Sequence, residues 1–242
     1  MATRADFLTR IRQEVQRTPG LFPASPAPRP ERPAEAADAV RRQMAERWPG
    51  ALQRFAEEFE RVSGVFHRVT GIEDVPRVIR AVARAKDARE LTAWDPRELG
   101  IDLRASLEGE GLSVAVAPSD GRDEARRRHG EAAARAQIGV TGADFALAET
   151  GTLILISGAG RPRSTSLLPD THIAIFGKQQ LLETLEQVGV MLEALHADPA
   201  RTMSGAMINF ITGPSRTADI ELTLTRGVHG PKEAHAIFVE SL

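Results

Sequence analysis

Amphipathic helices are predicted wherever apolar residues recur every three or four positions along the chain. The first covers residues 3–17 and has four apolar residues on one face, Phe7, Leu8, Ile11 and Val15. The same periodicity returns in four further stretches, 34–63, 73–86, 122–135 and 178–196. Pro49 interrupts the second of these helices, and because proline lacks a backbone N–H, one kinked helix and two shorter helices both remain open.

Between the helices the pattern changes to short alternating or continuous apolar runs, which are typical of strands. These runs are 64–70, 90–94, 111–118, 171–177, 206–213 and 235–240. The segment 138–158, IGVTGADFALAETGTLILISG, has apolar runs broken by glycine and predicts two neighbouring strands. Strands that alternate with amphipathic helices predict an α/β fold with a mainly parallel sheet flanked by helices.

The domain organisation follows from the proline-rich segment Pro19–Pro33, which contains six prolines and favours an extended, semi-rigid connection. We expect residues 1–33 to form an N-terminal helical arm and linker, and residues 34–242 to form one α/β domain. A chain of 242 residues is long enough for one substantial core. The arm could pack on its own domain, on a second copy of the chain in a homo-oligomer, or on another partner.

Composition narrows the class of protein. A net charge of -2 gives no general attraction to nucleic acid, so no nucleic-acid partner is expected. The chain has no run of 18 apolar residues and its first 17 residues do not read as a signal peptide, which predicts a cytoplasmic location without membrane insertion. It has no cysteine, so it offers no disulfide, no thiolate metal site and no cysteine ligands for an iron–sulfur cluster. Any redox centre would then belong to a partner or to a bound organic cofactor.

A candidate anion-binding loop lies in GTLILISGAGRPRS, residues 151–164, where an apolar strand ends in a glycine-rich turn. Gly158 and Gly160 let backbone N–H groups approach an anion, and Arg163 can bind phosphate or carboxylate through two hydrogen bonds. The loop is not a dinucleotide-binding fingerprint, because Arg163 stands where the third glycine belongs. An anion-binding loop and an exposed turn with solvated arginines are both consistent with this pattern.

Glu149 stands between apolar strands, beside the hydroxyl groups of Thr150 and Thr152. A carboxylate in a low-dielectric setting has a raised pKa and can act as a nucleophile or as a general acid and base. The alternative is a strand-end glutamate whose carboxylate accepts hydrogen bonds from neighbouring backbone N–H groups.

The stretch GPSRTADIELTLTRGVHGP, Gly213–Pro231, follows the predicted strand 206–213. Open α/β sheets bind ligands at the carboxyl ends of their strands, so this stretch is a candidate rim of a site. Ser215 and Thr217 offer hydroxyl groups, Arg216 a guanidinium, and Asp219 a carboxylate to orient it. In the alternative, a hydroxyl caps a short helix and Arg216 pairs with Asp219 structurally.

Two histidines, His172 and His229, could approach Glu149 or Asp219 in space. A metal site needs three or more convergent ligands, and no spacing such as His-Glu-x-x-His occurs. Structural histidines are therefore favoured and no metal is expected.

Three motifs in order, ETGTLIL, SLLPDTHI and GPSRTADIELTLTRGVHGP, resemble the LUD domain family, and within it the lactate utilization protein C branch. The resemblance covers residues 60–242. It implies a fold similar to the NagB/RpiA/CoA-transferase-like group. It also implies the cluster-free component of a system that oxidises L-lactate to pyruvate with iron–sulfur partner proteins, and so a subunit rather than a complete enzyme. A small carboxylate or phosphorylated ligand is expected.

The family motifs also mark candidate site residues. The resemblance suggests three candidate catalytic groups, Glu149, Asp219 and His229. The candidate ligand-binding residues are Thr150, Gly151, Thr152, Gly158, Gly160, Arg163, His172, Gly213, Pro214, Ser215, Arg216, Thr217, Glu221 and Gly230. Fold analogy leaves two alternatives, a stand-alone acyl-transfer or ligase enzyme with Glu149 as nucleophile, and a structural assembly subunit with a vestigial pocket.

Overall fold

The computed structural model describes residues 4–17, 30–119, 122–199, 207–218, 224–227 and 229–242. The chain forms two compact units, residues 1–32 and 33–242. The first unit contains helix α1 (Arg4–Arg17), on which Phe7, Leu8 and Ile11 are exposed. The second unit contains the α/β fold.

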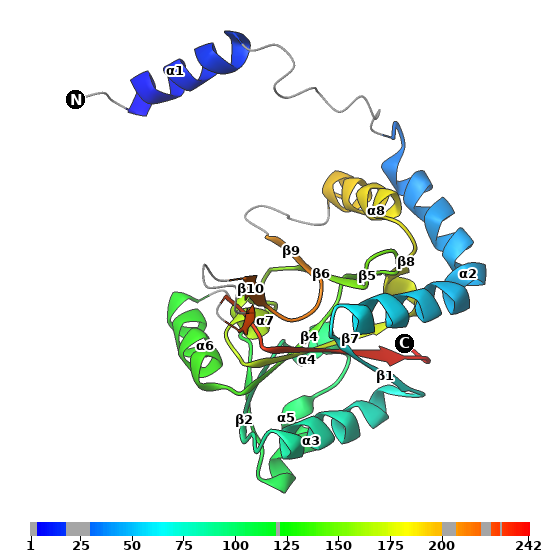
Figure 1. Ribbon diagram of the computed structural model, residues 1–242, viewed down its shortest axis with the longest axis vertical. Helices are drawn as coiled ribbons and strands as arrows, with labels where there is room; N and C mark the ends of the chain where they lie inside the picture. Colours follow the sequence, from blue (N-terminus) through cyan, green and yellow to red (C-terminus); the bar gives the residue numbers. More distant parts are fainter. Residues whose placement is uncertain (1–3, 18–29, 120–121, 200–206, 219–223, 228) are drawn as a thin grey trace. The chain divides into compact units, whose positions relative to one another are not determined.

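A six-stranded sheet forms the centre of the second unit, with its strands in the order β1-β12-β7-β4-β2-β3 (Figure 1). Its strands are β1 (Val65–Val69), β2 (Glu90–Ala93), β3 (Ser113–Val116), β4 (Ile138–Gly142), β7 (Thr171–Gly177) and β12 (Glu233–Val239). All neighbouring strands are parallel. The inner strands β4 and β7 are buried along nearly all their length, as continuous apolar runs predict. The predicted α/β fold with a mainly parallel sheet is confirmed.

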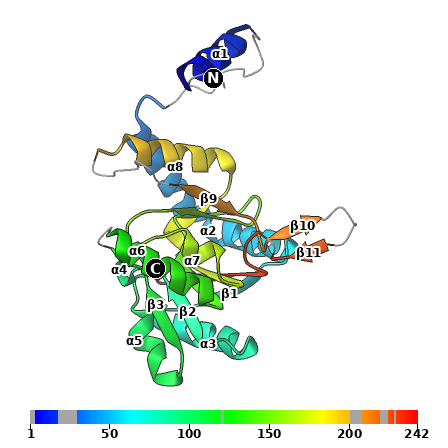
Figure 2. The same cartoon turned by 90° about the vertical axis from the view of Figure 1, so that its left-hand side faces the viewer.

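Helices cover both faces of this sheet (Figures 1 and 2). α3 (Val75–Ala85) and α5 (Leu103–Leu107) lie on one face. The other face carries α2 (Pro33–Arg61), α6 (Asp123–Arg135) and α7 (Ser164–Leu167). The chain first adds β2 and β3 toward one edge, and then returns to add β4, β7 and β12 on the other side of β2. The neighbours β2 and β4 therefore mark the point where the winding reverses.

Aromatic contacts hold α2 on the sheet. Pro49 lies inside α2 without ending it, so the single helix is observed, and it bends along its length (Figure 1). Phe55 of α2 meets Phe176 of β7 with ring centroids 5.0 Å apart. Phe238 of β12 contacts both Phe176 and Trp48 of α2. Such edge-on and stacked pairs stabilise the packing beyond the apolar area that they bury.

A smaller sheet of order β8-β5-β6-β9 lies on the α2 side of the large sheet. Its strands are β5 (Phe145–Leu147), β6 (Thr152–Ile156), β8 (Leu181–Leu182) and β9 (Ile208–Ile211). The expectation of two strands in segment 138–158 is wrong, because this segment holds three. β4 belongs to the large sheet, whereas β5 and β6 form an antiparallel hairpin of the small sheet.

The helix predicted over 178–196 begins later, because α8 (Leu185–Ala197) starts only after Thr184. The Thr184 hydroxyl accepts a hydrogen bond from Gln187 N at 3.3 Å, which caps the helix. Residues 178–182 form the 3-10 turn η3 (Lys178–Gln180) and β8. The remaining elements are η1 (Ile72–Asp74), α4 (Pro96–Leu99), η2 (Glu108–Glu110), β10 (Arg216–Ala218) and β11 (Leu224–Arg226). Within the described ranges, no helix is both long and apolar enough to cross a membrane.

Candidate functional site

A cavity of about 820 Å³ lies at the carboxyl ends of the parallel strands. Trp94 follows β2, Ala143 follows β4 and Lys178 follows β7, and all three line the cavity. Because β2 and β4 are the strands at which the winding reverses, the cavity lies at the topological switch point, where open α/β sheets bind ligands. We call it the switch-point cavity. Its other lining residues are Arg41, Met44, Ala45, Trp48, Glu98, Gly142, Asp144, Phe145, Arg161, Gln179, Gln180, Leu181, Leu182, Met191 and Leu195.

Arg161 enters this cavity from the turn after β6, and two carboxylates hold it. Its Nη1 donates to Asp144 Oδ1 at 2.9 Å, and its Nε lies 3.5 Å from Glu98 Oε2. The guanidinium carbon lies 6.0 Å from the centroid of the Trp94 ring. Asp144 also accepts a hydrogen bond from Ile156 N at 2.7 Å. Arg161 is therefore fixed in orientation by Asp144, which lies between β4 and β5, and by Glu98 of α4.

Lys178 is one of three cations that line the switch-point cavity, with Arg161 and Arg41, and Arg41 is exposed and paired with Asp38. Lys178 is half-buried, and its Nζ lies 5.6 Å from the centroid of the Trp48 ring. Among the residues that the structure describes, Lys178 has no carboxylate partner. A partly desolvated ammonium group without a counter-ion favours an anion beside it.

Gly158 and Gly160 lie in the turn after β6 that leads to Arg161, and neither glycine lines the cavity. The Gly160 carbonyl accepts from Asp95 N at 2.9 Å, and its φ of +71° is one that glycine adopts without strain. A Cβ at Gly160 would lie 2.9 Å from Asp95 Cβ. Arg163 is exposed and contacts Met207 Sδ, whereas Arg161 is the guanidinium that enters the cavity.

Glu149 lies in the turn between β5 and β6 and is exposed, so the low-dielectric setting considered for its carboxylate is not observed. Its Oε2 accepts a hydrogen bond from Leu185 N, the first residue of α8, at 3.0 Å. The carboxylate thus satisfies one of the backbone donors that the start of α8 leaves without an intrahelical partner.

The other residues of the ETGT motif tie the same hairpin to its neighbours. The Thr152 hydroxyl is 2.7 Å from the hydroxyls of both Thr150 and Thr212. Gly151 is buried, and a Cβ there would lie 2.3 Å from Phe59 N of α2. These contacts connect the hairpin to α2 and to the residue that follows β9.

His172 is fully buried within β7, away from the switch-point cavity. Its Nε2 lies 2.9 Å from the Thr141 hydroxyl. Burial, with a smaller effect from His235, lowers the pKa of His172 to about 3. His235 of β12 contacts His67 of β1 with Nδ1 and Nε2 3.0 Å apart, and burial lowers the pKa of His235 to about 4. Both rings are therefore neutral near pH 7 and lie in the packed sheet.

The expectation that the stretch Gly213–Pro231 lies at the carboxyl ends of the parallel strands is wrong for its described residues Gly213, Ser215, Arg216 and Pro231. Gly213 packs against Val62, and Arg216 Nη2 donates to Val62 O at 2.6 Å. Ser215 N donates to Pro231 O at 2.8 Å. Val62 precedes β1 and Pro231 precedes β12, so these residues lie at the amino ends of the sheet. The strand before the stretch, β9, belongs to the small sheet, which is why the positional rule failed.

The structure describes some of the remaining residues of this motif and not others. Thr217 lies in β10, opposite Thr225 of β11. Pro214 is buried, His229 is exposed, and a Cβ at Gly230 would lie 3.4 Å from Ser215 Cβ. Two predicted site residues lie outside the described residues, Asp219 and Glu221.

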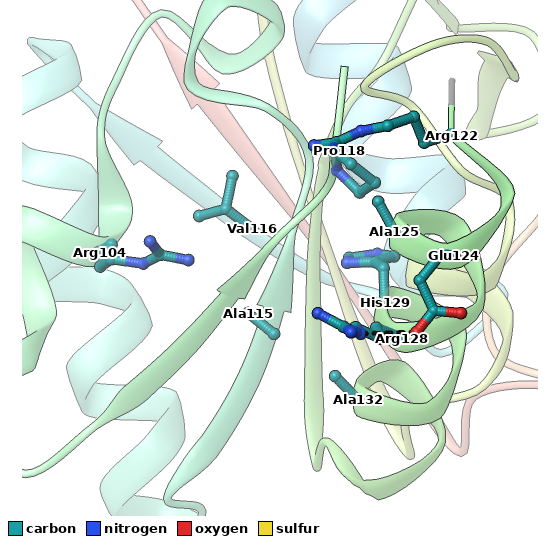
Figure 3. Close-up of a pocket in the computed structure, with 10 residues that line it drawn as sticks. All are labelled: Arg104, Ala115, Val116, Pro118, Arg122, Glu124, Ala125, Arg128, His129 and Ala132. Atoms are coloured by element: carbon teal, nitrogen blue, oxygen red, sulfur yellow. Dashed lines mark hydrogen bonds and ion pairs between the residues drawn. The ribbon is translucent and has the colours of Figure 1, made fainter. Parts of the chain in front are cut away.

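A second cavity, of about 370 Å³, lies beside the edge strand β3 at the start of α6 (Figure 3). Arg104 and Arg128 reach toward it from opposite sides, and His129 forms part of its wall. Arg128 Nε is held by Glu124 Oε1 at 2.8 Å, and Arg104 Nε donates to Val114 O at 3.3 Å. Because these arginines already have protein partners, the switch-point cavity with Lys178 is the stronger candidate site.

Metal binding has no support in the described ranges, since no group of three or more His, Asp or Glu side chains there is placed to hold an ion. Trp94, Arg161 and Lys178 were not among the site residues predicted from the sequence. The signal that could have found Trp94 and Lys178 is their position at the carboxyl end of a predicted strand, since Trp94 ends the predicted strand 90–94 and Lys178 follows the predicted strand 171–177.

Comparison with known proteins shows which family and which solved structure this chain resembles. The family model of the LUD domain matches residues 52–239. Lactate utilization protein C of Halalkalibacterium halodurans is 41% identical over 172 residues, which cover 71% of each chain. Lactate utilization protein C of an Exiguobacterium species is 33% identical over 248 residues, covering 100% of this chain and 98% of the relative. The crystal structure of a DUF162 family protein from Deinococcus radiodurans shares the fold, with a TM-score of 0.51, 19% identity, and coverage of 79% of this chain and 97% of that chain.

Proposed function

Because the chain belongs to the LUD domain family, we propose that it is a component of an L-lactate utilization system whose iron–sulfur partner proteins carry the electrons. The pathway is supported by relatives named lactate utilization protein C, one of which aligns with the whole chain. The chain has no cysteine, so in this proposal cysteine-held clusters belong to the partners.

The role proposed for the chain within this system is to bind an anionic ligand in the switch-point cavity. The observation that carries this step is Lys178, a half-buried cation without a carboxylate partner in the described part of the chain. Arg161 lies in the same cavity but is already paired with Asp144 and Glu98. Lys178 therefore binds the anionic group, while Arg161 forms a rigid part of the wall.

The test replaces Lys178 in the bacterium that carries this gene, and compares growth on L-lactate with that of the parent strain and of a strain in which the gene is deleted. Lys178→Met keeps the length of the side chain and removes its charge, and we expect it to abolish growth on lactate while growth on glucose and the melting temperature stay unchanged. The matched control is Lys232→Met, because Lys232 Nζ pairs with Asp170 Oδ2 at 2.9 Å and does not line the switch-point cavity. This control variant should grow normally on lactate.

Two results would contradict the proposal at different levels. Normal growth of a gene deletion on L-lactate would remove the pathway assignment. Normal growth of Lys178→Met, together with a growth defect in the deletion, would keep the pathway and remove the ligand-binding role of Lys178.

A further inference from the structure

The switch-point cavity is much larger than lactate needs. Its volume of about 820 Å³ lies in the range of roughly 300–1,000 Å³ that is typical of cavities for drug-sized ligands. Lactate has about the bulk of three or four water molecules, on the order of 100 Å³. Bound alone, lactate would leave most of the cavity to water.

One wall of this cavity is apolar and is built by α2, β8 and α8. Met44, Leu181 and Met191 are almost fully buried there, and Trp48 and Leu195 are half-buried. Methionine side chains adapt their shape and make favourable sulfur contacts with aromatic rings. Water against such a wall is unfavourable, so the wall favours an apolar group on the ligand.

Lys178 joins the apolar wall to the charged end of the cavity. Its Nζ lies 5.6 Å from the centroid of the Trp48 ring. Trp48 in turn stacks on Phe238, with centroids 5.9 Å apart and an interplanar angle of 22°, which fixes the plane of the indole. A ligand with its anionic group at Lys178 therefore extends over a flat aromatic surface.

We propose that the ligand of the switch-point cavity is an amphipathic organic anion with a planar aromatic body, larger than lactate. Its anionic group binds Lys178, and its ring packs against Trp48 and the methionine wall. This inference rests on the proposed function, because it names the ligand class of the same cavity. It makes the chain a receptor for an aromatic cofactor or co-substrate of lactate oxidation, and lactate itself binds elsewhere in the system.

Three probe molecules test this ligand class by isothermal titration calorimetry on the full chain. 2-Naphthoate has the anion and the planar body, 2-naphthalenemethanol lacks the charge, and octanoate lacks the ring. We expect 2-naphthoate to bind roughly a hundredfold more tightly than L-lactate, because the naphthyl group buries apolar surface that lactate does not have. It should also bind more tightly than octanoate.

Variants separate the two parts of the site. Lys178→Met should weaken the binding of 2-naphthoate about tenfold, because this probe loses a charge-assisted contact. The affinity for 2-naphthalenemethanol should stay within about twofold of the parent value. Leu195→Ser should weaken the binding of both naphthyl probes, and Lys232→Met should change the affinity for neither probe. Variants are compared only when their melting temperatures match that of the parent protein.

Tryptophan emission shows where the probes bind. The chain has two tryptophans and no tyrosine, and both tryptophans, Trp48 and Trp94, line the switch-point cavity. Naphthoate binding should therefore quench the emission after correction for probe absorption. The quenching should fall strongly in Trp48→Phe.

The proposal is overturned if L-lactate or octanoate binds as tightly as 2-naphthoate, if Lys178→Met leaves 2-naphthoate binding unchanged, or if millimolar 2-naphthoate does not bind. Binding and growth measurements together distinguish failure of this ligand class from failure of the proposed function. A chain that fails to bind 2-naphthoate but needs Lys178 for growth on lactate keeps the function and loses the ligand class. A chain that binds 2-naphthoate through Lys178 but grows normally on lactate as Lys178→Met keeps the ligand class and loses the proposed role of this binding in lactate use.

Discussion

Gly151, the glycine of the ETGT motif, is predicted to be required by packing. Its φ is +60°, and a Cβ there would lie 2.3 Å from Phe59 N and 2.6 Å from the Glu58 carbonyl carbon. Both contacts are with the backbone of α2, which cannot rotate away as a side chain could. For Gly151→Ala, the left-handed conformation costs about 1 kcal/mol and the forced displacement of α2 about 1–3 kcal/mol. The free energy of unfolding should therefore fall by about 2–4 kcal/mol.

Urea unfolding and thermal scanning measure this effect. At roughly 2–4 °C per kcal/mol for a chain of this size, the melting temperature should fall by about 5–15 °C. Gly130→Ala in α6 is the matched control, because a Cβ at Gly130 meets nothing within 4 Å and alanine is the better helix former. The control should raise the free energy of unfolding by about 0.5–1 kcal/mol. A Gly151→Ala variant within about 0.5 kcal/mol of the parent protein would refute this packing argument.

Three further experiments test the buried histidines, the core and the Glu149 side chain. Burial lowers the pKa of His172 to about 3 and that of His235 to about 4. The unfolded chain therefore binds more protons below pH 6.5, and the free energy of unfolding should fall from pH 6.5 to pH 4 by up to about 1.4 kcal/mol per pH unit and histidine. Urea titrations at several pH values measure this slope, and His235→Gln should flatten it. Phe55→Ala should lower the free energy of unfolding by about 3–5 kcal/mol in the same assay, because Phe55 is fully buried, and a loss below 1 kcal/mol would contradict this. Glu149 is exposed and caps α8, so incubation with acyl-CoA should give no adduct on it by mass spectrometry, and a Glu149 adduct would support the acyl-transfer alternative.

Local pattern predicted most of the elements but not their assignment to sheets. The apolar runs of β7 and β12 were predicted correctly as strands. Both strands are buried, and burial on both faces removes the polar alternation. Segment 138–158 was misjudged, since nothing local distinguishes a strand that pairs with β7 from one that turns back into a separate hairpin. The start of α8 was misplaced, because the apolar residues Leu181 and Leu182 fit a helical period as well as a short strand.

The residues of the candidate site were predicted less well than the secondary structure. Position in the chain favoured Arg163 and the Gly213–Pro231 stretch, because each follows a predicted strand. In the structure Arg161 enters the switch-point cavity, and the described part of that stretch lies at the amino ends of the sheet. Lys178 carried no motif and became a candidate only when its neighbours were known.

The sequence by itself determined the α/β class, through the alternation of strand and helix periods, and the family, through three motifs in order. Only the tertiary structure decided which loops meet. Strand order follows from how distant segments pack together, so β2 lies beside β4 although β3 and α6 intervene in the chain. That pairing brings Trp94, Arg161 and Lys178 into one cavity, because a ligand site depends on distances in space that local periodicity does not contain.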